Sequence, residues 1–95
     1  MVYGDQPVHE AARNDTKELA VMLKNNPELR DAPAFRAETP LHAAVDADNI
    51  ESVNLLLKAG ANPNALNEEG EPPVFDAKSR KVMEALKAAG AKFDI

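Results

Sequence analysis

Apolar residues in the middle of the chain recur at the spacing of a short helix. Leu41, Ala44 and Val45 lie three and four positions apart, which gives one narrow apolar stripe. Thr39 is a suitable N-cap for this helix, and Pro40 fits its first position, where the missing N–H group costs nothing. The pattern predicts a helix that begins at the proline and presents small residues to its neighbours.

A second amphipathic helix is predicted directly after the first. Asp48 and Asn49 separate the two, because both residue types tolerate left-handed backbone and cap a following helix. Gly60 supplies the left-handed stop at the other end. The apolar positions between these signals are Ile50, Val53, Leu56 and Leu57. Together the two segments form a helix–turn–helix unit.

The same unit recurs at a fixed period along the chain. Each copy starts at a proline followed by an apolar residue, and the three evenly spaced prolines are Pro7, Pro40 and Pro73. His9 and His42 occupy the third position of the first two copies, and Phe75 stands there in the third. A period between about 20 and 50 residues is typical of stacked supersecondary units, so we expect one domain over residues 1–95. The repeats are approximately residues 4–36, 37–69 and 70–95.

The copies differ in two places. Pro73 and Gly90 lie closer together in the chain than the corresponding pair in the middle copy, Pro40 and Gly60, which predicts a shorter helix linker in the third copy. The loops between copies have Gly4, Ala37 and Gly70 at equivalent positions. Because alanine lacks the backbone freedom of glycine, we expect the loop before Thr39 to bend differently from its counterpart.

These residues resemble the ankyrin repeat. The resemblance rests on the Thr-Pro-Leu-His start at residues 39–42, the Ala pair that follows, and Gly-Ala-Asn-Pro-Asn-Ala at residues 60–65. It covers nearly the whole chain, and it implies an all-α ankyrin-repeat solenoid of stacked helix–turn–helix units with hairpin-like finger loops. It also implies a binding surface made of the finger loops and the exposed side of the first helices.

Twelve residues belong to that implied surface. For Phe35, which lies beside a basic residue, two interpretations stay open: it folds back against the stack, or it anchors a partner. The twelve are Asp5 of a partial N-terminal finger; Arg13, Asn14, Asp46 and Ala47 of the first helices; Phe35, Arg36 and Glu38 of the first finger; and Leu66, Glu68, Glu69 and Glu71 of the second finger.

Charge is concentrated in one part of the chain. The whole chain has a net charge of −5, but residues 38–76 contain eight acids and only Lys58 as a base. Such a block repels phosphate, so nucleic acid is not an expected partner. It is either a solvated face or a patch that steers a basic partner. Five of the twelve surface positions are acids that lie within residues 38–71, which favours the basic partner.

Candidate chemistry is sparse. His9 and His42 are the residues that could serve as bases or metal ligands, but in this motif the resemblance implies that they tie neighbouring loops together. The chain has no cysteine, and we expect no metal, no cofactor and no enzymatic activity. No apolar run approaches the roughly 20 residues that span a bilayer, so membrane insertion is not expected. The absence of cysteine fits the cytoplasm, and a periplasmic or secreted location stays open if a leader has been removed.

Taken together, the sequence predicts a non-enzymatic protein–protein interaction module that is monomeric when free. We expect it to hold a folded partner with a basic surface or cleft through an acidic concave face and the finger loops. An enzyme inhibitor or immunity protein would act in this way. The alternative hypothesis is a structural repeat protein that self-associates or forms arrays.

Overall fold

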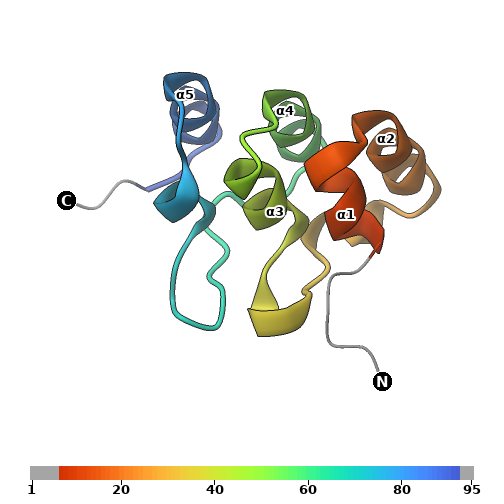
Figure 1. Ribbon diagram of the computed structural model, residues 1–95, viewed down its shortest axis with the longest axis horizontal. Coiled ribbons are helices and arrows are strands. Elements are labelled where there is room, and N and C mark those ends of the chain that lie inside the picture. The colour runs from red at the N-terminus through yellow and green to blue at the C-terminus, as the bar shows by residue number, and fades with distance from the viewer. Residues whose placement is uncertain (1–6, 93–95) are drawn as a thin grey trace.

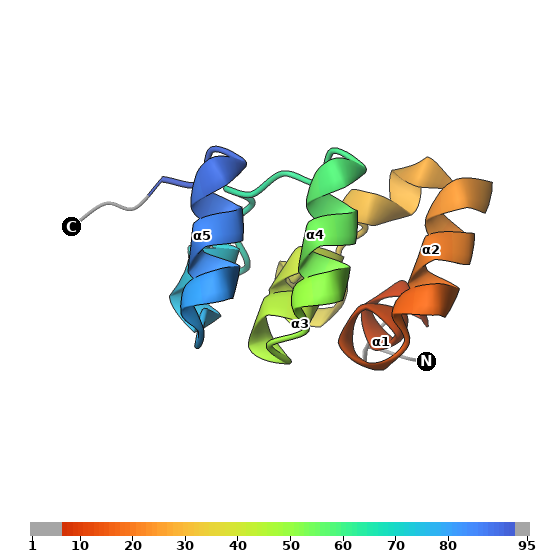
Figure 2. The same ribbon diagram turned by 90° about the horizontal axis from the view of Figure 1, so that it is seen from above.

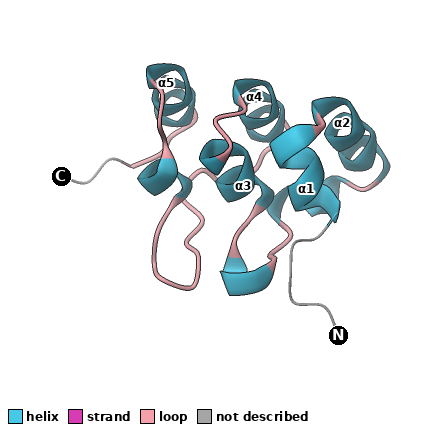
Figure 3. Cartoon of the chain, viewed as in Figure 1, coloured by secondary structure: helices cyan, strands magenta, loops and turns pink. Residues whose placement is uncertain are grey.

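The computed structural model describes residues 7–92, apart from the side chain of Phe35. Within this range the chain is all helical and contains no strand (Figure 3), so the predicted all-α class is confirmed. The α-helices are α1 (Pro7–Asn14), α2 (Thr16–Asn25), α3 (Pro40–Asp46), α4 (Ile50–Lys58) and α5 (Arg80–Ala88). The 3-10 turns are η1 (Pro27–Asp31), η2 (Phe35–Ala37) and η3 (Pro73–Asp76).

The helices stack as three units in two layers. Unit 1 is α1 with α2, unit 2 is α3 with α4, and unit 3 is η3 with α5. The outer helices α2, α4 and α5 lie side by side, and α1, α3 and η3 form the inner layer in front of them (Figures 1 and 2). Two loops project from the same edge of the stack, below the inner layer in Figure 1. We call residues 33–38 the first finger and residues 66–71 the second finger.

Unit 2 begins and turns as its sequence predicts. The Thr39 hydroxyl accepts a hydrogen bond from the backbone N–H of His42, and Pro40 takes the first helical position. Between the helices Asp48 adopts a φ of 57°, in the left-handed region. The Asn49 side chain then caps α4 by accepting a hydrogen bond from the N–H of Ser52.

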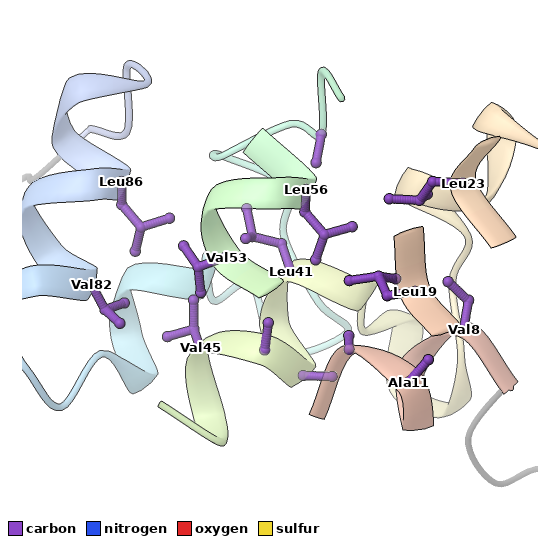
Figure 4. Packing of buried hydrophobic residues seen from close by; sticks show 14 residues of the cluster. Val8, Ala11, Leu19, Leu23, Leu41, Val45, Val53, Leu56, Val82 and Leu86 are labelled. Carbon is purple, nitrogen blue, oxygen red and sulfur yellow. The ribbon is translucent and has the colours of Figure 1, made fainter. Parts of the chain in front are cut away.

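The core lies between the two layers and runs along the whole stack. Leu23, Leu56 and Leu86 hold equivalent places on the three outer helices and are buried (Figure 4). Val8 and Leu41 of the inner helices pack beneath them and are also buried. Each such side chain contributes about 1.5–3 kcal/mol of burial free energy. Neighbouring units therefore share one continuous apolar interior rather than separate cores.

Polar ties that the sequence did not indicate join the units. The Asn49 side-chain amide donates to the carbonyl oxygens of Ala12 and Arg13 in unit 1, each at 3.2 Å. On the outer side, the Asp31 carboxylate accepts the N–H of Asn62 at 3.0 Å. The same tie recurs one repeat later, where the side-chain oxygen of Asn64 accepts the N–H of Lys92 at 2.8 Å. These bonds fix the register of each unit on the next.

The third unit is shortened in its first helix, and the expected shorter linker is wrong. The segments between the helices of units 2 and 3 both have three residues, 47–49 and 77–79. The inner segment of unit 3 is instead only the single 3-10 turn η3, where unit 2 has the seven-residue helix α3. Conserving the linker keeps α5 in line with α4, because Ser79 caps α5 as Asn49 caps α4.

The first finger differs from the second, but not at the residue that the sequence singled out. Ala37 adopts a φ of 60° and Gly70 a φ of 77°, so both lie in the left-handed region. Corresponding hydrogen bonds close both fingers: Ala34 N–H donates to Glu38 O, and Asn67 N–H donates to Glu71 O. The difference lies at Arg36, which is left-handed as well, with a φ of 67°.

Candidate protein-binding surface

Each finger is held against the stack by a buried histidine from the preceding inner helix. His42 Nδ1 accepts the backbone N–H of Thr39 at 3.1 Å, so the ring proton lies on Nε2. That proton is donated to the carbonyl oxygen of Glu71 at 2.9 Å. His9 Nε2 donates in the same way to the carbonyl oxygen of Glu38 at 2.7 Å. The structure thus places both histidines as ties between units, as the resemblance implied.

The two fingers are also bonded to each other. The backbone N–H of Glu68 donates to the carbonyl oxygen of Arg36 at 2.8 Å. The Arg36 guanidinium in turn forms an ion pair with the Glu69 carboxylate. An exposed ion pair of this kind contributes less than about 1 kcal/mol, but together with the backbone bond it fixes the spacing of the fingers. The two loops therefore present one surface.

Ten of the twelve sequence-predicted residues have described side chains, and all ten reach the surface. We call their combined area, on α1, α3 and the fingers, the inner surface. Leu66 is the large aliphatic member, and 60% of its surface is exposed. Asp5 lies outside the described residues, and so does the Phe35 side chain, which leaves its two interpretations untested. The exposed members are Asn14, Arg36, Asp46, Ala47, Leu66, Glu68 and Glu69, and the half-buried members are Arg13, Glu38 and Glu71.

Two acids of the inner surface are paired within the chain. Asp46 lies 3.2 Å from the Lys78 ammonium group, which also donates to the Asp46 carbonyl oxygen at 2.5 Å. Glu69 is paired with Arg36, as described above. Among the residues that the structure describes, Glu68 forms no ion pair and is exposed. The negative charge that remains unpaired is therefore smaller than the acidic block alone indicated.

Sequence reasoning missed two residues of this region. Lys78 stands two positions beyond the acidic block, and its partner is 32 residues away, so the sequence showed no link between them. Phe75 was noted only as a replacement for histidine, yet 67% of its side chain is exposed. The available signal was its position: it stands where His42 contacts the following finger, and no described residue covers it.

Two further features are absent from the described part of the chain. Residues 7–92 contain no group of three or more His, Cys, Asp or Glu side chains that could hold a metal ion. None of the described helices is both long enough and apolar enough to cross a membrane.

Comparison with known proteins agrees with the geometry. The family model of the ankyrin repeat matches residues 38–68. The mitochondrial disaggregase of Homo sapiens is 40% identical over 68 residues, which are 72% of this chain and 10% of that protein. The palmitoyltransferase ZDHHC13 of Homo sapiens is 40% identical over 60 residues, 63% of this chain and 10% of that protein. Ankyrin repeat and SOCS box protein 3 of Homo sapiens is 35% identical over 75 residues, 76% of this chain and 14% of that protein.

The chain spans about a tenth of the length of the first two relatives, so the likeness concerns a small part of each. Ankyrin repeats generally mediate protein–protein interactions, and domains made of them are typically non-enzymatic. Residues 38–68 match the family model, and the units on either side have the same stacked arrangement, with a shortened inner segment in unit 3. The chain therefore contains an ankyrin repeat and has the ankyrin-repeat fold.

Proposed function

We propose that this chain binds a folded protein partner through the inner surface. The observation that carries the proposal is the pair of tied fingers. Their backbones are fixed by the bond between Glu68 and Arg36 and by the histidine ties, so Leu66 and Glu68 are presented with little freedom to lose on binding. A surface that is ordered before it meets its partner avoids part of the entropic cost of association.

The finer proposal is that the partner has a basic surface. Glu38, Glu68 and Glu71 line the fingers, and Glu68 has no cation beside it in the described structure. Complementary charge of this kind speeds encounter and selects among partners more than it adds affinity. A partner with a basic cleft would be occluded by the fingers, so we further propose that the chain acts as an enzyme inhibitor or immunity protein.

The test separates the inner surface from charge in general. One variant carries Glu38→Lys and Glu68→Lys on the fingers. Its matched control carries Glu51→Lys and Glu84→Lys, which make the same change of net charge on exposed positions of the outer helices. Both variants and the parent chain are immobilised and exposed to an extract of the source organism at low salt, and captured proteins are identified by mass spectrometry.

We expect a protein that the parent and the control retain and the finger variant loses. Its dissociation constant, measured by calorimetry, should rise as salt is added, because screening shortens the Debye length from about 30 Å at 0.01 M to about 8 Å at 0.15 M. Equal loss in both variants would exclude the fingers as the binding site. Affinity independent of salt would exclude the basic partner. If the captured protein is an enzyme, its activity should fall to zero at a one-to-one ratio, and full activity at saturation would exclude inhibition.

A further inference from the structure

The C-terminal end of the stack exposes apolar side chains at positions that are covered elsewhere. Phe75 is 67% exposed and Met83 is 40% exposed. Their counterparts in unit 2 are His42 and Val53, which are 1% and 0% exposed. These two residues of unit 2 are covered from the side of unit 3. The second finger, which leads into unit 3, accepts the hydrogen bond from His42, and Val53 points toward α5 (Figure 4). Phe75 and Met83 therefore mark the side of unit 3 that faces away from unit 2.

The opposite end is identified by the same comparison. Pro40 and Pro73, the equivalent prolines of units 2 and 3, are fully buried, whereas Pro7 is exposed. Glu10 is likewise exposed, although its counterpart Ala43 is buried. A shallow groove lies here between α1 and α2, and its walls are formed by Pro7, Glu10, Ala11, Asn14, Asp15 and Glu18. Figure 2 shows the two ends, with α5 at one and α1 and α2 at the other.

The two ends have opposite charge. On α5, Arg80 and Lys87 flank Met83 at spacings of three and four residues, so the three side chains share one face. On α2, Glu18 lies four residues before the half-buried Met22, and these two also share a face. One end is thus apolar with basic residues beside it, and the other is apolar with acidic residues beside it.

The chain already contains a junction of this kind. A groove on the outer side of the stack is lined by Lys17 and Ala20 of α2 and by Glu51 and Leu55 of α4. On the α2 side of this groove lie a base and a small apolar residue. On the α4 side lie an acid and a larger apolar residue. When the three units are aligned, allowing for the three residues that unit 3 lacks, the residues at the two ends of the stack occupy the same positions as the residues of this groove. The equivalent pairs are Lys17 with Arg80, Ala20 with Met83, Glu51 with Glu18, and Leu55 with Met22.

We propose that a second copy of this chain stacks head to tail on the first, with its N-terminal end on the exposed face of Phe75, Met83 and Arg80. Glu18 and Met22 of the second copy then lie against Arg80 and Met83, in the register that α4 has on α2. This contact leaves the inner surface free, so it is independent of the function proposed above. Because head-to-tail contacts do not close on themselves, assembly continues into longer chains as concentration rises.

The contact is one repeat wide and belongs to the weak class of interfaces, below about 1,200 Å² of buried area. Sedimentation velocity at low salt, from about 10 µM to about 1 mM, covers the dissociation constants of that class. The C-end variant carries Arg80→Glu and Lys87→Glu, and the N-end variant carries Glu10→Lys and Glu18→Lys. All four positions are exposed, and circular dichroism melts verify that each variant folds.

We expect the average mass of the parent chain to rise with concentration, while each variant alone stays monomeric at least tenfold higher in concentration. An equimolar mixture of the two variants should assemble again, because each then offers an end that complements the other. A chain with all four reversals should also assemble.

Three results would overturn the proposal. The first is a parent chain that stays monomeric up to about 1 mM, the upper limit of the weak class. The second is an N-end variant that assembles as well as the parent, which would mean that two C-terminal faces meet. The third is an equimolar mixture of the variants that remains monomeric.

Discussion

Replacing Ala37 by glycine should stabilise the protein. Ala37 is exposed and has a φ of 60°, so its methyl group gains no packing and clashes with its own backbone. A non-glycine residue in the left-handed region costs about 1–2 kcal/mol. Glycine also loses more conformational freedom than alanine on folding, and this reduces the gain in the free energy of unfolding by about 0.4–1 kcal/mol. The expected net gain in the free energy of unfolding is about 0.5–1 kcal/mol.

The second finger offers the reverse experiment. Gly70 has a φ of 77°, and a methyl group added there would meet no atom within 4 Å. Gly70→Ala therefore adds backbone strain without a steric clash, and after the same correction for chain freedom it should lower the free energy of unfolding by about 0.5–1 kcal/mol. Ala59→Gly is the control, because Ala59 is exposed with an ordinary helical φ of −78°. It should destabilise by about 0.5–1 kcal/mol.

Urea titrations and thermal melts followed by circular dichroism measure all three changes. For a domain of this size, 1 kcal/mol corresponds to about 4–8 °C in melting temperature. We expect Ala37→Gly to melt about 2–8 °C higher than the parent, since its gain is about 0.5–1 kcal/mol. A lower melting temperature for Ala37→Gly, or an unchanged one for Gly70→Ala, would refute the assignment of strain to these two backbone positions.

Three further substitutions test the ties between units by the same melts. His42→Ala breaks the bond to the second finger and leaves the buried N–H of Thr39 unpaired, so we expect the free energy of unfolding to fall by about 2–4 kcal/mol. The control is Phe75→Ala at the equivalent exposed position, which should change the free energy of unfolding by less than about 0.5 kcal/mol. Asn49→Ala removes a cap and its bonds to unit 1 and should cost about 2 kcal/mol, against less than about 0.5 kcal/mol for the exposed Asn54→Ala on the same helix. Leu56→Ala opens a cavity at a fully buried position and should cost about 2–5 kcal/mol, and a smaller loss would show that the neighbouring units collapse into the space.

The sequence predicted those features whose signals lie close together in the chain. The cap at Thr39, the proline after it and the break at Asp48 depend on residues within one turn, and the structure has all three as expected. The histidine ties were also foreseen, but only from the family resemblance. The regular spacing of the repeats predicted the order of the units, because equivalent apolar positions must stack to bury one another.

Features that depend on distant partners could not be predicted. Unit 3 is three residues shorter than unit 2, and from the sequence alone the deletion could lie in the inner helix or in the linker. In the structure it lies in the inner helix, because the linker keeps the length that lets Ser79 cap α5. Ala37 is left-handed because the hydrogen bond between Ala34 and Glu38 closes the finger around it, against its own preference. The pairing of Lys78 with Asp46 spans 32 residues and exists only because the units stack.

The reduction of the third inner helix to one 3-10 turn has a consequence for how the molecule comes apart. In a stack where each unit touches only its neighbours, stability is a sum of local terms, and an end unit can open while the rest stays closed. Among its own residues unit 3 buries only Pro73, Val82 and Leu86 completely. Amide hydrogens of α5 should therefore exchange with deuterium sooner than those of α4, and proteases should cut first at this end.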